Sequence, residues 1–245
     1  ELAPQRAAGI PRFPFDRSTD SFGLEKTITY GRLPSGLVML NWPLEGNDWH
    51  NGLDRALSAD VEVRAELVQE MQGHSKDFLA ALEECSGGWI TAGNAFPGAD
   101  PSLALMPYWR ESRRLMGRTT VTERDLLPIS TEALRGPLPI DAHGRCTSIA
   151  VGTYANDHHY PGEDWPLAPK SVRWGGRWSG TPFCIPFDAL ITDSIPNLVM
   201  AEKGFSVSHM ANGATRLQPL ILNLGQVAGL AAAMAVRQGC DPADL

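Results

Sequence analysis

The 245-residue sequence is poor in cysteine and in basic residues. Its four cysteines, Cys85, Cys146, Cys184 and Cys240, are far apart and form no CxxC pair. This spacing argues against a zinc site or a thioredoxin-type redox site. Buried free thiols are the plainer interpretation, and they favour a reducing compartment, so we expect a cytoplasmic protein. With 21 Lys and Arg against 28 Asp and Glu, the net charge of -7 argues against a nucleic-acid partner.

Long apolar runs are also missing. None approaches the ~20 residues that a membrane-spanning helix requires, and no signal peptide is recognisable. A GxSxG nucleophile elbow is absent as well, which counts against a hydrolase. Hydrophobic residues make up 43% of the chain and charged residues 20%, a composition typical of a soluble protein with a buried core. The chain begins ELAPQRAAGI, without Met, which suggests a processed product or a fragment.

Strand and helix patterns mix without regular alternation. Two short strands around a Pro-Ser-Gly turn are predicted between Lys26 and Leu40. An apolar period near 3.6 predicts a helix from Ser58 to Glu84, capped by Ser58 or Asp60, with Gly73 as a candidate break. Further strands are expected over residues 118–122, 148–154 and 183–187. The mixture predicts an α+β fold with a mixed or antiparallel sheet.

The C-terminal stretch from Asn197 to Gly239 has the most distinctive pattern, NLVMAEKGFSVSHMANGATRLQPLILNLGQVAGLAAAMAVRQG. We expect a short strand over 197–201, a polar loop over 205–215 and then a helix in which Pro219 is the first residue. Small residues cover most of this helix, which allows another backbone or a flat ligand to approach closely. Its N-terminus offers N–H groups to an anion. Tight packing of the helix on a sheet would explain the same composition equally well.

This stretch resembles the C-terminal motif of the FAD-dependent oxidoreductase family whose FAD domain is like that of glutathione reductase. Members show an NLLVAGR-like strand, a Ser-rich turn, an RxxP segment and a GQAAGxAAA helix. PYWRESRRLMGRTTVTERD (107–125) is similar to the family's YxRESRRIxG segment, and VGTYANDHHYPG (151–162) is similar to its GxYxxDxH segment. IPFDALITDSIPNLVMAEK resembles the family's IPYRAL…NLLVA passage. The resemblance covers roughly residues 105–239.

The resemblance implies that residues 1–195 form a substrate-side (cap) domain and that residues 196–245 supply the last strand and helix of a Rossmann-like FAD domain. FAD binding of this kind requires a GxGxxG turn for the pyrophosphate, and the sequence contains none. In the family that motif precedes the matched region. We therefore expect the C-terminal portion of a flavoprotein, whose Rossmann half lies in the same precursor or in a second chain.

The resemblance also implies roles in the cofactor site. Glu202 falls where an acidic residue accepts hydrogen bonds from a ribityl hydroxyl, although most relatives have Gly-Arg where this chain has Glu202-Lys203. Arg216, Gln218 and the N–H groups after Pro219 would lie near the flavin pyrimidine, where the helix dipole favours negative charge. The expected FAD-binding residues are Glu202, Lys203, Arg216, Gln218, Gly225 and Gln226.

Candidate catalytic residues come from two loops. Asp157 and His159 match the family's DxH, and a histidine can move protons near pH 7; a polar surface loop would explain them equally well. No third ligand stands at metal-site spacing, so we expect no metal. His209, in the loop beside the expected flavin, is the second proton-transfer candidate. Arg110 and Arg113 would anchor an anionic substrate, or they belong to one basic helix face.

The implied activity is hydride transfer between an organic small-molecule substrate and FAD. An alternative is a non-catalytic accessory or binding subunit that has lost the flavin. The missing GxGxxG favours this alternative, whereas the retention of Glu202, Arg216 and the GQVAG helix opposes it. A third, weaker interpretation is a hydrolase or lyase that uses the His159 loop.

Overall fold

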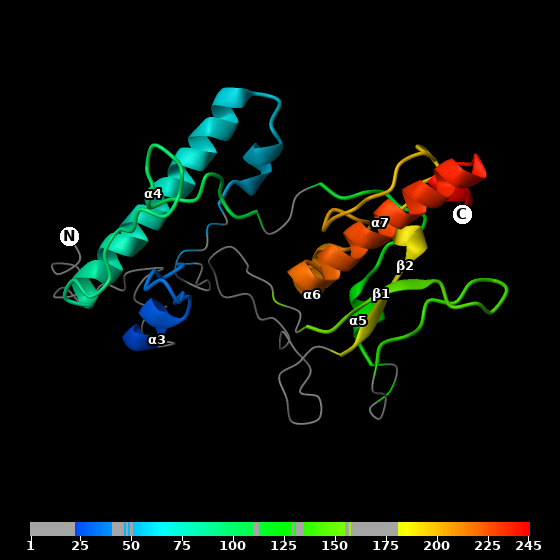
Figure 1. The fold of residues 1–245 in the computed structure, drawn as a ribbon, viewed down its shortest axis with the longest axis horizontal. Helices are drawn as coiled ribbons and strands as arrows, with labels where there is room; N and C mark the ends of the chain where they lie inside the picture. The colour runs from blue at the N-terminus through cyan, green and yellow to red at the C-terminus, as the bar shows by residue number, and fades with distance from the viewer. Residues whose placement is uncertain are drawn as a thin grey trace. The chain divides into compact units, whose positions relative to one another are not determined.

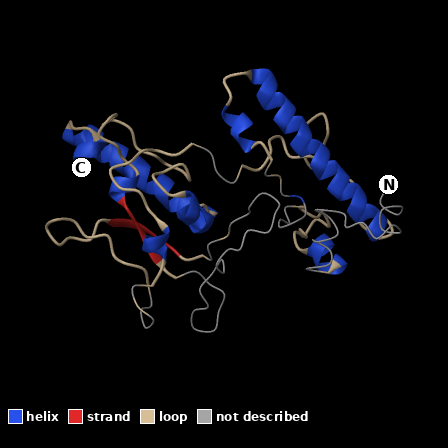
Figure 2. Cartoon of the chain, turned by 180° about the vertical axis from the view of Figure 1, so that it is seen from behind, coloured by secondary structure: helices blue, strands red, loops and turns tan. Residues whose placement is uncertain are grey.

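The computed structural model describes residues 23–40, 47, 49, 51–109, 113–128, 130, 135–154, 157 and 181–245. The chain divides into two compact units, Glu1–Tyr108 and Trp109–Leu245. Among the described residues, helices dominate both units, and a small antiparallel sheet lies in the second (Figures 1 and 2). The predicted α+β class is therefore confirmed at this level. The boundary expected between residues 195 and 196 separates a cap domain from the end of an FAD domain. This boundary stays a prediction.

Helix α4 (Val61–Cys85) is the longest element of the first unit. It begins at Val61 instead of the predicted Ser58, because Asp60, the second of the two predicted caps, accepts a hydrogen bond from the Glu62 amide at 2.8 Å. The break suggested at Gly73 is wrong, since the helix continues through this residue. Its inward side contributes Phe78 and Leu82 to a core cluster. Phe78 is 0% exposed and Leu82 is 1% exposed.

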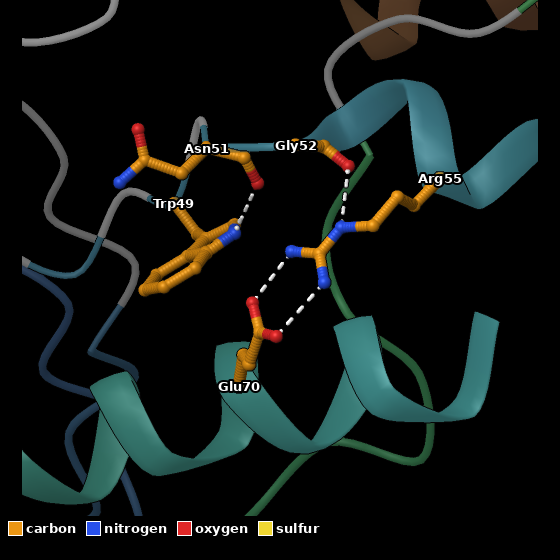
Figure 3. Close-up of polar contacts among 5 residues, drawn as sticks. All are labelled: Trp49, Asn51, Gly52, Arg55 and Glu70. Atoms are coloured by element: carbon orange, nitrogen blue, oxygen red, sulfur yellow. Dashed lines mark hydrogen bonds and ion pairs between the residues drawn. The ribbon is translucent and has the colours of Figure 1, made fainter. Parts of the chain in front are cut away.

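The 3-10 helix η2 (Leu53–Leu57) is fastened to α4 by an ion pair between Arg55 and Glu70. The pair is bidentate, with distances of 2.8 Å from Nη1 to Oε1 and 2.5 Å from Nη2 to Oε2 (Figure 3). The hydrogen bonds raise the pKa of Arg55 and lower the pKa of Glu70. Because both side chains are in contact with solvent, the pair fixes geometry more than it adds stability.

The loop before η2 also contacts α4. The Trp49 indole donates a hydrogen bond to the Asn51 carbonyl at 2.8 Å (Figure 3). Its ring meets the His74 ring of α4 in an edge-on arrangement, with 5.3 Å between the centroids. Trp49 is thus used in ordinary loop packing.

The hairpin predicted between Lys26 and Leu40 is wrong in its first half, where the chain forms helix α3 (Leu24–Thr29). The β-forming residues Thr27 and Ile28 are overruled by packing, because Ile28 is buried in the same cluster as Phe78 of α4. The turn itself is confirmed. Gly36 has φ of 85° and donates to the Leu33 carbonyl, which is a conformation that suits glycine.

The second unit contains strands β1 (Ser148–Gly152) and β2 (Phe183–Pro186), which pair antiparallel as two of the predicted strands. Helix α7 (Gln218–Gln238) packs against β1, as Figure 1 shows. Figure 2 shows the same layering from behind. The core of this unit is apolar, and its large, fully buried side chains include Phe183, Ile185, Leu190, Phe205 and Leu224.

Extended segments surround this core without forming further regular strands in the described residues. The strand expected over 118–122 is reduced to a single parallel bridge between Val121 and Val207. The strand expected over 197–201 is likewise an extended segment, held by a hydrogen bond of 2.8 Å from the Met200 amide to the Leu190 carbonyl. A strand of a Rossmann-type sheet needs a neighbouring strand on which to pair, and the described residues supply none along this segment.

Among its described residues, the second unit also contains four short helices: α5 (Glu123–Leu126), η3 (Phe187–Ala189), α6 (His209–Thr215) and η4 (Pro242–Asp244). The polar loop predicted over 205–215 is therefore wrong in its second half. Ser208 starts α6 by accepting a hydrogen bond from the Ala211 amide at 3.0 Å. The following residues are small and buried, which lets α6 pack into the core despite its polar sequence.

Helix α7 buries one face and leaves another open. Ala228, Ala231 and Ala235 lie against the unit, each 5% exposed or less. On another side Leu222 is 75% exposed and Val236 is 83% exposed. By length and composition alone α7 would suffice to cross a membrane, contrary to the expectation that no run is long enough. In this chain 28% of the apolar window of α7 is buried, and a single helix of this length and composition does not establish a membrane span.

Candidate functional site

The junction between α6 and α7 holds an ion pair between two residues predicted for different roles. Arg216 Nη2 lies 3.0 Å from Asp157 Oδ2. The Arg216 side chain is 9% exposed and the Asp157 side chain 31%. The Asp157 amide also donates to the Gly213 carbonyl of α6 at 3.3 Å. Both backbone and side chain of Asp157 therefore hold the segment after β1 onto this junction.

The N-terminus of α7 follows directly. Gln218 and Pro219 are exposed, and Pro219 is the second residue of the helix, not the first as predicted. Leu217 is the N-cap and has no polar side chain, and within the described part of the chain no side chain caps this end. The first N–H groups of the helix are consequently available to an acceptor, with partial positive charge behind them.

A second group of predicted residues gathers at the turn Glu202–Gly204. Glu202 Oε1 accepts a hydrogen bond from the Gly204 amide at 2.8 Å. The Gly204 carbonyl in turn accepts from the Leu115 amide at 2.8 Å, which brings the segment after Arg113 alongside the turn. A carboxylate has about four acceptor positions, so Glu202, which is exposed, retains capacity for hydroxyl donors.

Lys203 and Arg113 have different environments in the second unit. The Lys203 ammonium donates to the carbonyl oxygen of Trp109, so part of its hydrogen-bonding capacity holds the chain at the start of the second unit. Arg113 is exposed, and its carbonyl lies close to Gly204. The structure thus brings the predicted substrate-side Arg113 and the predicted cofactor-side Glu202 onto adjacent segments.

Gly225 of α7 lies against the residue that directly precedes Glu202. A Cβ built at Gly225 would lie 3.5 Å from the Ala201 carbonyl oxygen, which is ordinary contact. The helix therefore approaches the backbone immediately before Glu202, as its small residues predict. Gln226, one position further, is exposed.

His209 is the first residue of α6 and is exposed. Partial burial and the nearby positive charge of Arg114 both lower its pKa, with burial the larger cause. Burial also lowers the pKa of Arg114. The neutral imidazole of His209 is thereby favoured near pH 7, the form that a general base requires.

Sequence reasoning missed Arg114. The sequence motif offers Arg110 and Arg113 as the functional arginines, whereas in the structure the side chain of Arg114 is half-buried and its charge lowers the pKa of His209. The signal available was its place directly after Arg113, because two adjacent residues of an extended chain face opposite sides and only one of them can face inward. Arg110 and His159 lie outside the described residues.

The cysteines and metal ligands give little further chemistry. All four cysteines are free thiols, as predicted, but Cys146 is exposed and the others are half-buried instead of buried. Across the described ranges, no three His, Cys, Asp or Glu side chains come together as metal ligands.

The donors of this unit suit part of a flavin. An open helix N-terminus next to an arginine fits the carbonyl and nitrogen edge of a pyrimidine ring, because both supply donors or positive charge. A carboxylate at the end of an extended segment fits a hydroxylated chain. A pyrophosphate is not provided for, since the sequence lacks the glycine-rich turn that brings a backbone close to it.

A model of the FAD dependent oxidoreductase family matches residues 4–245 of the chain. No curated protein and no solved structure matches it. The matched range includes both units and every residue of the candidate site. The chain therefore belongs to the FAD dependent oxidoreductase family, whose members use FAD as their cofactor.

Proposed function

We propose that the chain is the C-terminal, substrate-side portion of a flavoenzyme that transfers hydride between an organic substrate and FAD. The observation that supports this most directly is the open N-terminus of α7 with Arg216 held beside it by Asp157. FAD, when bound, supplies the hydride-accepting chemistry. The chain's own contribution is to bind one end of the ring system and to orient the substrate.

In this proposal the N–H groups at the start of α7 and the guanidinium of Arg216 stabilise negative charge at the pyrimidine edge. Gln218, exposed at the same end, adds an amide donor. Glu202 accepts hydrogen bonds from the ribityl hydroxyls. Gly225 has no side chain, so α7 can approach Ala201 closely. Gln226 and Lys203 stay candidate contacts of FAD.

His209 is the proposed proton acceptor on the substrate side. Its lowered pKa favours the neutral imidazole, so it can receive the proton that a substrate hydroxyl or amine loses as hydride leaves. Arg113 and Arg110 are proposed to attract an anionic group of the substrate. His159 is kept as a second proton-transfer candidate.

The proposed partner is a Rossmann half with the GxGxxG turn, in the same precursor or in a second chain. Support comes from the exposed apolar side of α7, which includes Leu222, Leu230 and Val236. An apolar stretch of this length marks a contact surface in a soluble protein. The four free thiols suit a reducing compartment such as the cytoplasm.

The proposal is tested by producing the chain together with its Rossmann half and recording the visible spectrum during anaerobic addition of candidate alcohols and amines. We expect bound oxidised FAD that bleaches with a substrate, and slower bleaching in His209→Gln with FAD still bound. A complex that binds FAD but bleaches equally fast in His209→Gln would remove His209 from the mechanism.

The alternative function is a non-catalytic accessory subunit that has lost the flavin. The absence of GxGxxG favours it. It predicts a colourless complex with every partner that co-purifies, and no spectral change when FAD is added.

A further inference from the structure

The Asp157–Arg216 pair joins two parts of the molecule that the proposed reaction must coordinate. Asp157 follows the last residue of β1, Gly152, by five positions, and Arg216 is the first of the two residues between α6 and α7. The two charged groups are 3.0 Å apart, and the Arg216 side chain is nine-tenths buried. A charge pair with this degree of burial is screened much less by solvent than a surface pair.

We propose that Asp157 is a positioning residue, which fixes the guanidinium of Arg216 at the α7 N-terminus and offsets its positive charge. This rests on the proposed function, because it assumes that the flavin pyrimidine meets this end of the helix. Asp157 was a candidate catalytic base in the DxH motif. A carboxylate oxygen that already accepts a hydrogen bond from a guanidinium is less available to receive a substrate proton.

The geometry of Asp157 supports positioning over catalysis. Its amide is bonded to the Gly213 carbonyl at 3.3 Å, and the Arg216 amide is bonded to the Asn212 carbonyl at 3.2 Å. Both residues are thus anchored through their backbones near the C-terminal end of α6, and their side chains form the ion pair. A residue held at both its backbone and its side chain is poised to keep a partner in place.

Opposite charges make opposite predictions for the flavin. In Asp157→Asn the negative charge 3.0 Å from Arg216 is removed, so the reduced, anionic flavin is favoured and the midpoint potential moves to a more positive value. In Arg216→Gln the negative charge of Asp157 stays behind, so the potential moves to a more negative value. The double variant restores a neutral pair and returns the potential toward that of the unchanged protein.

The experiment measures the midpoint potential of FAD in the complex of this chain with its Rossmann half, for both single variants and the double variant. Asp193→Asn is the matched control. Asp193 pairs with Arg118 at 2.7 Å, and Arg118 also binds the carbonyl of Ala243 near the other end of α7. We expect no shift of the potential in this control.

Three outcomes decide the matter. Opposite shifts with compensation in the double variant support the inference. A shift in Arg216→Gln without one in Asp157→Asn overturns it and leaves the proposed function standing. No shift in any variant, with FAD bound, shows that the flavin lies elsewhere and overturns the proposed site as well.

A second measurement that needs no cofactor tests the inference in variants that fail to retain FAD. Hydrogen exchange of the chain by itself should be faster in Asp157→Asn over α6 and the start of α7, and unchanged there in Asp193→Asn. Unchanged exchange in Asp157→Asn would contradict the positioning role.

Discussion

His209 and Arg114 illustrate how neighbouring side chains set a protonation state. Two causes act in the same direction on His209, burial first and the Arg114 charge second. Both disfavour the imidazolium ion, because it would lose hydration and meet a like charge. The neutral imidazole of His209 is therefore favoured at neutral pH.

Replacing Arg114 by Gln should raise the pKa of His209, because the repulsive charge is removed while the burial stays. The matched control is Arg113→Gln, which changes an exposed neighbour in the sequence. Proton NMR titration of the His209 ring provides the measurement. A His209 pKa that is unchanged in Arg114→Gln, or raised equally in the control, would contradict the account.

Asp100 gives a pH dependence with a defined sign. The hydrogen bond from Lys76, with an Nζ–Oδ2 distance of 2.8 Å, and those from Ser102 lower the pKa of Asp100 to about 2. The folded pKa lies below the unfolded value of about 3.9, so this contribution to stability is complete above pH ~4 and is lost as pH falls toward 2. In Lys76→Gln the pKa of Asp100, followed by NMR, should rise; an unchanged value would contradict the assignment. Ser75→Ala is a control on the same helix.

At the scale of elements, close approach of segments is best tested at Gly117. A Cβ there would lie 2.8 Å from Ser206 Cβ and 3.0 Å from the Asp188 carbonyl oxygen. Gly117→Ala should therefore lower the free energy of unfolding by ~1–3 kcal/mol. Gly229→Ala is the control, because nothing lies within 4 Å of its Cβ position; this change should stabilise α7 by up to about 1 kcal/mol.

Chemical denaturation of the separate chain measures both variants. Equal stability of Gly117→Ala and the unchanged chain would show that the segments around Gly117 are looser than the structure indicates.

Local signals predicted some elements well and others badly. Helix α4 and strands β1 and β2 follow from periodicity, since each has an apolar face and a clear end, such as the Asp60 cap. Helix α3 could not be predicted from local periodicity, because it is stabilised by the packing of Ile28 against α4. Helix α6 was missed because HMANGAT has polar and glycine residues, and only the Ser208 cap indicated a helix start.

At the scale of the whole molecule, the open side of α7 is the feature to explain. On this side Gly229, Ala232 and Ala233 are small exposed residues, and Leu222 and Val236 are large exposed apolar ones. Such a surface suits close contact with another apolar element. We interpret it as the face that the Rossmann half covers.

The paired change Leu222→Gln and Val236→Gln should leave the folding of this chain unaffected, because both side chains are largely exposed in it. Association with the Rossmann half should weaken at least about tenfold, or ~1.4 kcal/mol, as measured by titration calorimetry. Val151→Gln is the control, an apolar side chain of β1 that is 64% exposed. Undiminished association of the double variant would place the contact elsewhere.

The sequence proposes members for the candidate site but not their arrangement. Motif resemblance selected Asp157, Arg216 and Glu202, and the structure places all three in the second unit. Resemblance could not show that Asp157 pairs with Arg216, since 59 residues separate them and the contact depends on how β1 and α6 pack. Nor could it show that Glu202 bonds to its own turn through Gly204.

The central claim is that this chain completes a flavin site together with a Rossmann half. Its most direct test is to purify the protein from its natural source and to record its visible absorbance together with the intact mass of each polypeptide. The account predicts the absorbance bands of oxidised flavin in a species that contains both this chain and a GxGxxG sequence. A colourless protein that binds no added FAD, even with such a Rossmann partner present, would contradict it.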